Sequence, residues 1–76
     1  MFRPQQKLTR TVLLVVGMKD GKCREAVHDA LAAVPGVRDV DVYLIRARAI
    51  VVHGGSCSRE TLVGVVVNAG YGAMSE

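Results

Sequence analysis

The order of apolar patterns along the chain constrains its fold more than any other feature. A β-branched apolar run is typical of a strand, and an apolar residue at every third or fourth position is typical of a helix lying on a sheet. The 76 residues predict six elements in the order strand, helix, strand, strand, helix, strand: Leu8–Val16, Gly21–Ala33, Val37–Leu44, Ala47–His53, Ser58–Ala69 and Tyr71–Met74.

The two helices are predicted from different signals. The first has a continuous apolar stripe and is stopped by Pro35–Gly36. Its stripe consists of Cys23, Val27, Ala30, Leu31 and Val34. The second contains Leu62–Val67, which would also suit a strand, but Ser56 or Ser58 is placed to cap a helix there. Its apolar face would consist of Leu62, Val66 and Ala69.

The element order βαββαβ predicts the fold class. Two split βαβ units with right-handed crossovers give one four-stranded antiparallel sheet with both helices on one face. The chain is therefore expected to be an α+β protein with the ferredoxin-like fold. Residues 8–76 would form this single domain, and residues 1–7, which are mostly polar and contain Pro4, would form a flexible leader.

Composition excludes several classes of function. The net charge is only +3, and the scattered Lys and Arg residues give no surface for nucleic acid. The run Val12–Val16 is too short for a membrane span or a signal core, and two cysteines are too few for a disulfide scaffold. No base and nucleophile pair stands out, so an enzyme is not expected. We therefore expect a soluble, cytoplasmic protein without membrane insertion.

The segment Gly17–Cys23 joins the first strand to the first helix. With Gly17-Met18 followed by Cys23, it resembles the loop Gly-Met-x-Cys-x-x-Cys of heavy-metal-associated domains, but Asp20 stands where the first cysteine belongs. Three further segments carry the same resemblance: Ala33–Val37, Val40–Val42 and Ala69–Ala73.

The resemblance implies a metal-handling protein. Members of this family are metallochaperones, mercury-binding proteins and N-terminal domains of metal-pumping ATPases, whose two cysteines pass Cu(I), Hg(II) or Zn(II) to a partner. It implies that Cys23 binds metal, that Met18 supports the loop and that Tyr71 lies near the site. A metal-transporting ATPase or another metalloprotein is the implied partner.

Asp20 changes the chemistry of the loop. A thiolate suits soft ions and a carboxylate suits hard ones, so Cys23 with Asp20 predicts a weak site for zinc or copper that needs further ligands from outside the chain. Asp20 is also a favourable N-cap residue for the helix that follows.

Cys57 follows the third strand, at the other end of the sheet, and is expected to be an incidental thiol or part of a separate weak site with His53.

The face of the sheet that points away from the helices is expected to be apolar. The outward positions are Val12, Leu14 and Val16 on the first strand, Ile50 and Val52 on the third, and Tyr43 on the second. A contiguous apolar patch of this kind marks an interaction surface. We therefore expect a symmetric homodimer, and the alternative function is a non-metal assembly module on the same fold.

Overall fold

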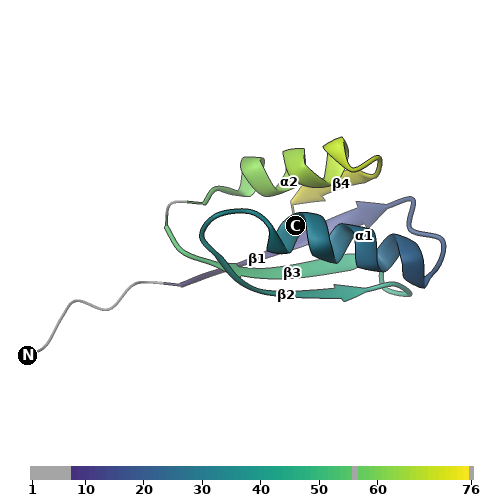
Figure 1. Cartoon of the computed structure of the whole chain (residues 1–76), viewed down its shortest axis with the longest axis horizontal. Helices are drawn as coiled ribbons and strands as arrows, with labels where there is room; N and C mark the ends of the chain where they lie inside the picture. The colour runs from purple at the N-terminus through teal and green to yellow at the C-terminus, as the bar shows by residue number, and fades with distance from the viewer. Residues whose placement is uncertain (1–7, 56, 76) are drawn as a thin grey trace, which may run out of the picture.

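The computed structural model describes residues 8–55 and 57–75, and in this part the predicted order of elements and the fold class are confirmed (Figure 1). The predicted leader lies outside the described residues. The elements are β1 (Thr9–Val16), α1 (Gly21–Ala32), β2 (Val37–Tyr43), β3 (Arg48–His53), α2 (Arg59–Asn68) and β4 (Gly72–Ser75). Their ends differ from the predicted ends by about one residue, because hydrogen bonding rather than hydropathy decides where an element stops.

The four strands form one antiparallel sheet in the order β2-β3-β1-β4. Helices α1 and α2 cover the same face of the sheet and touch each other, with α1 beside β2 and α2 beside β4 (Figure 1). Neither helix in the described part of the chain has the length and hydropathy needed to cross a bilayer.

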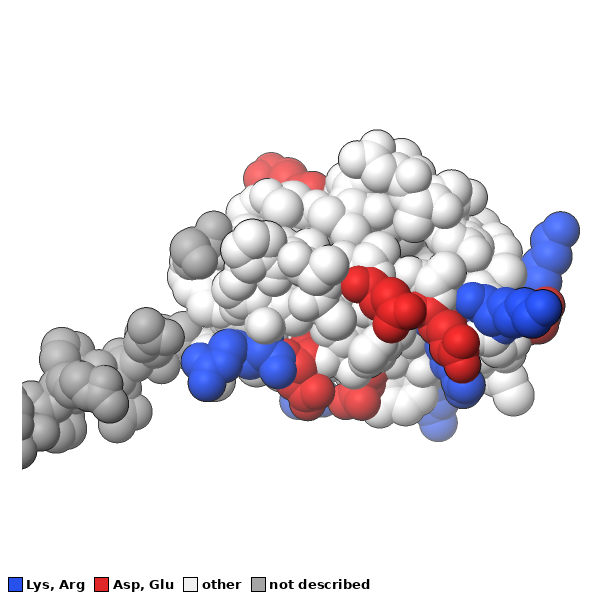
Figure 2. All heavy atoms as spheres, in the orientation of Figure 1, with Lys and Arg blue, Asp and Glu red and all other residues white. Residues whose placement is uncertain are grey.

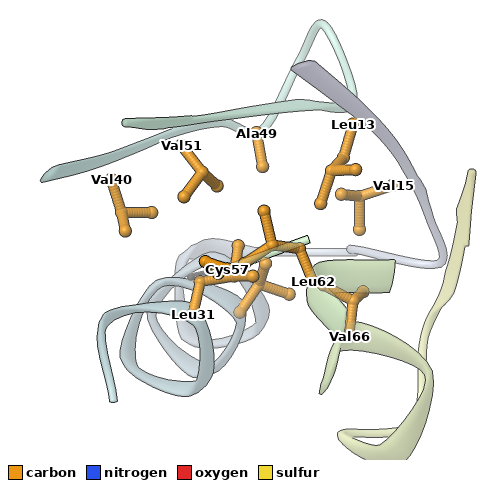
Figure 3. Close-up of a cluster of buried hydrophobic side chains, with 10 residues drawn as sticks. Leu13, Val15, Leu31, Val40, Ala49, Val51, Cys57, Leu62 and Val66 are labelled. Atoms are coloured by element: carbon orange, nitrogen blue, oxygen red, sulfur yellow. The ribbon is translucent and has the colours of Figure 1, made fainter. Parts of the chain in front are cut away.

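The core lies between the sheet and the two helices (Figure 3). Every second residue of β1 and β3 points into it, which agrees with the register predicted from the sequence. The core consists of Leu13, Val15, Val27, Leu31, Val40, Ala49, Val51, Cys57, Leu62 and Val66. Ala69 does not belong to the buried face of α2, since it is the exposed C-cap residue. Aliphatic side chains therefore fill most of this interior, together with Cys57, and Met18 and Tyr71 pack against it.

The hairpin between β2 and β3 closes at the same end of the sheet as the loop that follows β1. Ala47 adopts a left-handed conformation with φ 56°, and its amide donates to the carbonyl of Leu44. Its own carbonyl accepts a hydrogen bond of 2.8 Å from the amide of Val15. The hairpin thereby holds the end of β1 in place just before the loop begins.

Candidate functional site

The loop between β1 and α1 is fixed by a helix cap. Asp20 has extended backbone angles, and its Oδ1 accepts a hydrogen bond of 3.1 Å from the amide of Cys23. The carbonyl of Asp20 accepts from the amide of Arg24, which starts the helix. One oxygen of the carboxylate is thus engaged in capping, a contact that stabilises a helix by about 1 kcal/mol.

Two residues hold the loop against the domain. Met18 is half-buried and packs on the hydrophobic core. Gly17 has φ +106°, a conformation that favours glycine, and a Cβ atom placed on it would lie 3.6 Å from Cδ1 of Tyr71. The ring of Tyr71 therefore lies close against the start of the loop.

Cys23 occupies the first turn of α1 and is partly exposed. Its pKa is lowered, first by a hydrogen bond from the Tyr71 hydroxyl and then by the backbone at Lys19 and Asp20. Desolvation and the Asp20 side chain oppose this shift. The same contact with Cys23 raises the pKa of Tyr71. Since the thiolate is the form that binds metal, the loop favours the reactive form of this cysteine.

The charges around this thiol are mostly positive. Lys19, Lys22 and Arg24 are all exposed and lie within four residues of Cys23 in the sequence, as do the two acids Asp20 and Glu25. Figure 2 shows blue side chains at the end of the molecule where β1 leads into α1.

The donor set is incomplete for a tightly held ion. Cys23 supplies one soft sulfur, Asp20 supplies a hard carboxylate that already caps the helix, and Tyr71 supplies a hydroxyl. Within residues 8–55 and 57–75, no three His, Cys, Asp or Glu side chains form a group that could hold a metal ion. The residues present could supply one thiolate ligand to a metal ion, and the other ligands would have to come from a second molecule.

We expect Tyr71→Phe to raise the pKa of the Cys23 thiol. The substitution removes the hydroxyl, which is the largest cause of the lowered pKa, and keeps the ring that lies on Gly17. At a pH below the thiol pKa the variant then holds less thiolate and reacts more slowly with iodoacetamide. Thiolate absorbance measured against pH checks this, with Tyr43→Phe as the control, because Tyr43 lies on β2 and is not among the causes of the Cys23 shift.

Cys57 does not complete the site. It lies in the connection between β3 and α2 and is buried in the core. The pairing of Thr9 with His53 places this connection at the far end of β1 from the loop, about seven strand residues or roughly 23 Å away. The expectation that Cys57 lies at the opposite end is therefore confirmed.

The alternative site at His53 and Cys57 finds no support. Nδ1 of His53 donates to the carbonyl of Gly54 at 2.9 Å, and Nε2 is 2.7 Å from the hydroxyl of Thr11. Both ring nitrogens of this buried histidine are thus engaged, and neither is available to a metal.

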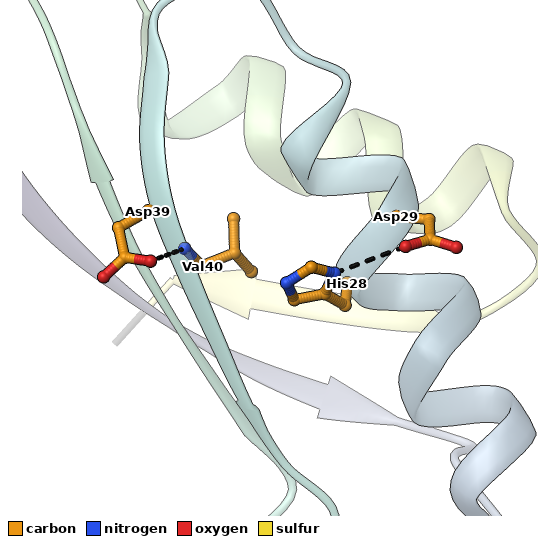
Figure 4. A network of polar contacts seen from close by, with 4 residues as sticks. All are labelled: His28, Asp29, Asp39 and Val40. Carbon is orange, nitrogen blue, oxygen red and sulfur yellow. Dashed lines mark hydrogen bonds and ion pairs between the residues drawn. The ribbon is translucent and has the colours of Figure 1, made fainter.

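His28 is a surface residue of α1. Its Nδ1 lies 3.3 Å from a carboxylate oxygen of the neighbouring Asp29 (Figure 4). Both side chains are largely exposed, so this contact contributes little to stability. Helix α1 therefore supplies no histidine ligand to a metal bound at Cys23.

The outer face of the sheet, opposite the helices, carries the residues predicted to form an interface. Val12, Leu14, Ile50 and Val52 are half-buried and alternate with the core residues of β1 and β3. Val16 is 56% exposed and Tyr43 44%. A shallow hollow lined by Val12, Tyr43, Arg46, Arg48 and Ile50 lies on this face. Their role as an interface stays a prediction.

The hydrogen bond between Tyr71 and Cys23 was not predicted. The sequence analysis placed Tyr71 near the loop only through the family resemblance, and no periodicity links two residues so far apart in the chain. Gly17 is the sequence signal at this place, but its φ of +106° accounts for the glycine, and a Cβ 3.6 Å from the ring would be an ordinary contact, so it does not by itself predict the tyrosine.

Comparison with known proteins agrees with this fold. The profile of the family described as "Heavy-metal-associated domain" matches residues 12–72. The chain is 40% identical over 62 residues to a mercuric reductase from Acidithiobacillus ferrooxidans; this match covers 82% of the chain and 11% of the reductase, so the chain spans about a tenth of that relative.

Two solved structures show the same fold. A copper-binding domain from HMA7, a P-type ATPase, has a TM-score of 0.87 at 29% identity, over 88% of this chain and 92% of that domain. The CopZ metallochaperone has a TM-score of 0.83 at 28% identity, over 87% of this chain and all of that protein.

Proposed function

The chain belongs to the heavy-metal-associated domain family, and we propose that it binds a thiophilic metal ion weakly through Cys23 and passes it to a partner protein. The observation that carries this proposal is the environment of Cys23. Its thiol lies in the first turn of a helix, and its pKa is lowered by the Tyr71 hydroxyl and by the backbone of the loop. Such a site favours the thiolate that metal transfer requires.

The altered loop decides which metal it holds. A single thiolate with an oxygen neighbour suits Zn(II), which accepts both ligand types, better than Cu(I), which prefers sulfur. Because Asp20 also caps α1, its carboxylate is at most a weak oxygen ligand. Other ligands then come from water or from the recipient, so the ion is held loosely and exchanges readily.

The partner and compartment follow from the same argument. A loosely held ion must pass to a protein with more thiolates, such as a metal-transporting ATPase or another metalloprotein. The similarity to CopZ and to the ATPase domain supports this kind of partner. The proposed role is a carrier rather than an enzyme, and we place it in the cytoplasm, where cysteines stay reduced.

We expect Cys23→Ala to abolish metal binding. Competition titration of Zn(II) and Cu(I) against chromophoric chelators under reducing conditions would show measurable binding by the wild type and none by the variant. Cys57→Ala is the matched control, since it removes the other thiol, which is buried in the core. Equal affinity of the wild type and Cys23→Ala would refute the proposed site.

A second candidate function, assembly through the outer sheet face, is favoured by the apolar residues on that face. Cross-strand pairing puts Asp41 beside Ile50 on one side of the patch and Arg10 beside Val52 on the other. A surface with an apolar centre and opposite charges at its margins suits packing against a second copy of itself. In this reading the domain forms a homodimer that does not depend on metal.

A further inference from the structure

The turn of the β2–β3 hairpin carries an apolar residue that neither the turn nor the core explains. The amide of Ala47 donates to the carbonyl of Leu44 at 3.2 Å, so Ile45 and Arg46 are the two central residues of a β-turn. Such turns favour Gly, Pro, Asn, Asp and Ser. Ile45 is 97% exposed and gains no packing within the domain. Because local sequence rules are most often broken at functional sites, this residue points to a surface that another molecule contacts.

Ile45 borders a hollow of about 460 Å³ between the hairpin and the start of α1, which we call the hairpin hollow. Four of its lining residues are aliphatic or aromatic and follow one another along the chain, and the other two are arginines. Tyrosine and arginine are enriched among the anchor residues of protein interfaces. The lining consists of Arg24, Val42, Tyr43, Leu44, Ile45 and Arg46. A hollow of this size can take a few side chains of a partner.

The hairpin is held in shape by the domain itself. The carbonyl of Ala47 accepts a hydrogen bond from the amide of Val15, and Nη1 of Arg48 donates to the carbonyl of Arg46 at 3.1 Å. Ala47 keeps its left-handed φ of 56°, which costs a residue other than glycine about 1–2 kcal/mol. A surface fixed in this way loses little conformational freedom when a partner binds.

Arg24 and Arg46 give the hairpin hollow its charge. Both are exposed, and no acidic side chain lines the hollow. Among the described residues, neither guanidinium forms an ion pair. Glu25 and Asp41 line a neighbouring hollow of about 310 Å³ that shares Arg24, but they do not neutralise it. An acidic side chain that stands next to an apolar one is therefore the complement of this surface.

The hairpin hollow lies at the end of the molecule that carries the metal loop. Arg24 follows Cys23 in α1, and a Cβ atom placed on Gly21 would lie 3.9 Å from its Nη2. The guanidinium therefore lies along the first turn of α1, between the hollow and the loop. Figure 2 shows blue side chains at this end. A molecule docked in the hollow lies beside the loop.

The lining of the hollow belongs entirely to described residues. The residues that border the undescribed ones lie elsewhere. Thr9 pairs with His53 at the far end of β1, and Ser75 pairs with Leu13 from β4. Strands β4 and β2 form opposite edges of the sheet, so β4 ends away from the hairpin hollow.

A second copy of the chain is a poor occupant. If the hairpin hollows of two copies faced each other about a twofold axis, Arg24 and Arg46 would meet their own counterparts, and like charges would be brought together. A different polypeptide that carries acidic residues fits the hollow better.

We propose that the hairpin hollow docks the protein that exchanges metal with Cys23, through a segment in which an acidic side chain stands next to an apolar one. The carboxylate binds Arg24 and Arg46, and the apolar side chain packs on Ile45 and Tyr43. Docking keeps the ligands of the partner close to the metal loop, so that the ion passes within a complex. The inference rests on the proposed function for the role of the partner, whereas docking itself needs no metal.

The test titrates the acetylated and amidated peptide Ser-Leu-Glu-Glu-Leu-Ser into the metal-free protein at low ionic strength and follows the amide resonances by NMR. The peptide should shift the amides of Arg24, Ile45 and Arg46. Replacing both of its glutamates by glutamine should weaken binding by about tenfold or more. Cys23→Ala should bind the peptide as the wild type does, so the docking surface is measured separately from the metal site.

Two variants of the hairpin test its residues. Arg46→Glu should weaken peptide binding by about tenfold or more, and Arg59→Glu is its control, because it reverses the same charge at the start of α2 outside the hollow. Ile45→Ser should also weaken binding while the melting temperature stays the same or rises, since serine suits a turn. Val67→Ser is the matched control at an exposed position of α2. Both hairpin variants should keep the affinity of the wild type for Zn(II).

Four outcomes would overturn the proposal. The first is the absence of shifts at Ile45 and Arg46 with the peptide at millimolar concentration. The second is equal binding by folded Arg46→Glu. The third is shifts at these amides that grow with protein concentration without peptide, which would mean that copies of the chain meet there. The fourth is binding through Ile45 to phosphatidylglycerol vesicles but not to the peptide. Failure of the metal site alone would show as equal metal affinity of the wild type and Cys23→Ala, with peptide binding intact.

Discussion

Asp20→Cys is expected to raise the affinity for Cu(I) by more than about a hundredfold, since even the loss of an outer-shell partner changes metal affinity by 10- to 100-fold. The variant places two thiols three residues apart at the start of α1, so both lie on one side of the helix. The loop is already held by Met18 on the core and by the ring of Tyr71 on Gly17. Competition titration against a chromophoric Cu(I) chelator under reducing conditions measures the gain.

Asp20→Ala separates the new thiol from the lost cap. Both variants lose the hydrogen bond from the Cys23 amide and about 1 kcal/mol of stability, but only one gains sulfur. We expect Asp20→Ala to bind Cu(I) no better than the wild type. If Asp20→Cys also shows no gain, the loop of this chain does not have the shape of a two-cysteine site, and its altered residue is not the reason for weak binding.

The fold was predictable because each element carries its own local signal. The stripe of α1 and the alternation along β1 and β3 gave the correct buried faces, including Val27 and Leu31 on the helix and Leu13 and Val51 on the strands. The second helix was the hardest to predict, since its valines favour a strand. Ser58 resolved this, because its side chain accepts a hydrogen bond from the amide of Thr61 and starts the helix.

Parts of the site depend on contacts that no local pattern contains. The cap at Asp20 was predictable because donor and acceptor are three residues apart. The hydrogen bond from Tyr71 depends on the way β4 returns beside β1, and it lowers the pKa of Cys23 only in the folded chain. Pairing and length are properties of the assembled sheet, and only the structure shows them.

Ile50→Lys is expected to dissociate the proposed dimer. Ile50 lies near the middle of the outer face, between Asp41 on β2 and Val12 on β1. In a monomer the lysine gains a cross-strand partner in Asp41, worth about 0.2–1 kcal/mol, so the fold is kept. In a dimer the same ammonium would be buried against a second apolar face, at a cost of several kcal/mol. The dissociation constant should then rise by about a hundredfold or more.

Sedimentation equilibrium over a range of concentrations, with a chelator present, measures this change. Ile45→Lys is the matched control: it makes the same substitution at the tip of the β2–β3 hairpin, where the side chain is 97% exposed and lies outside the patch. It should leave the mass of the wild type unaltered. A wild type that stays monomeric at millimolar concentration would contradict assembly through this face. If Ile50→Lys remained a folded dimer, the copies would have to meet through another surface.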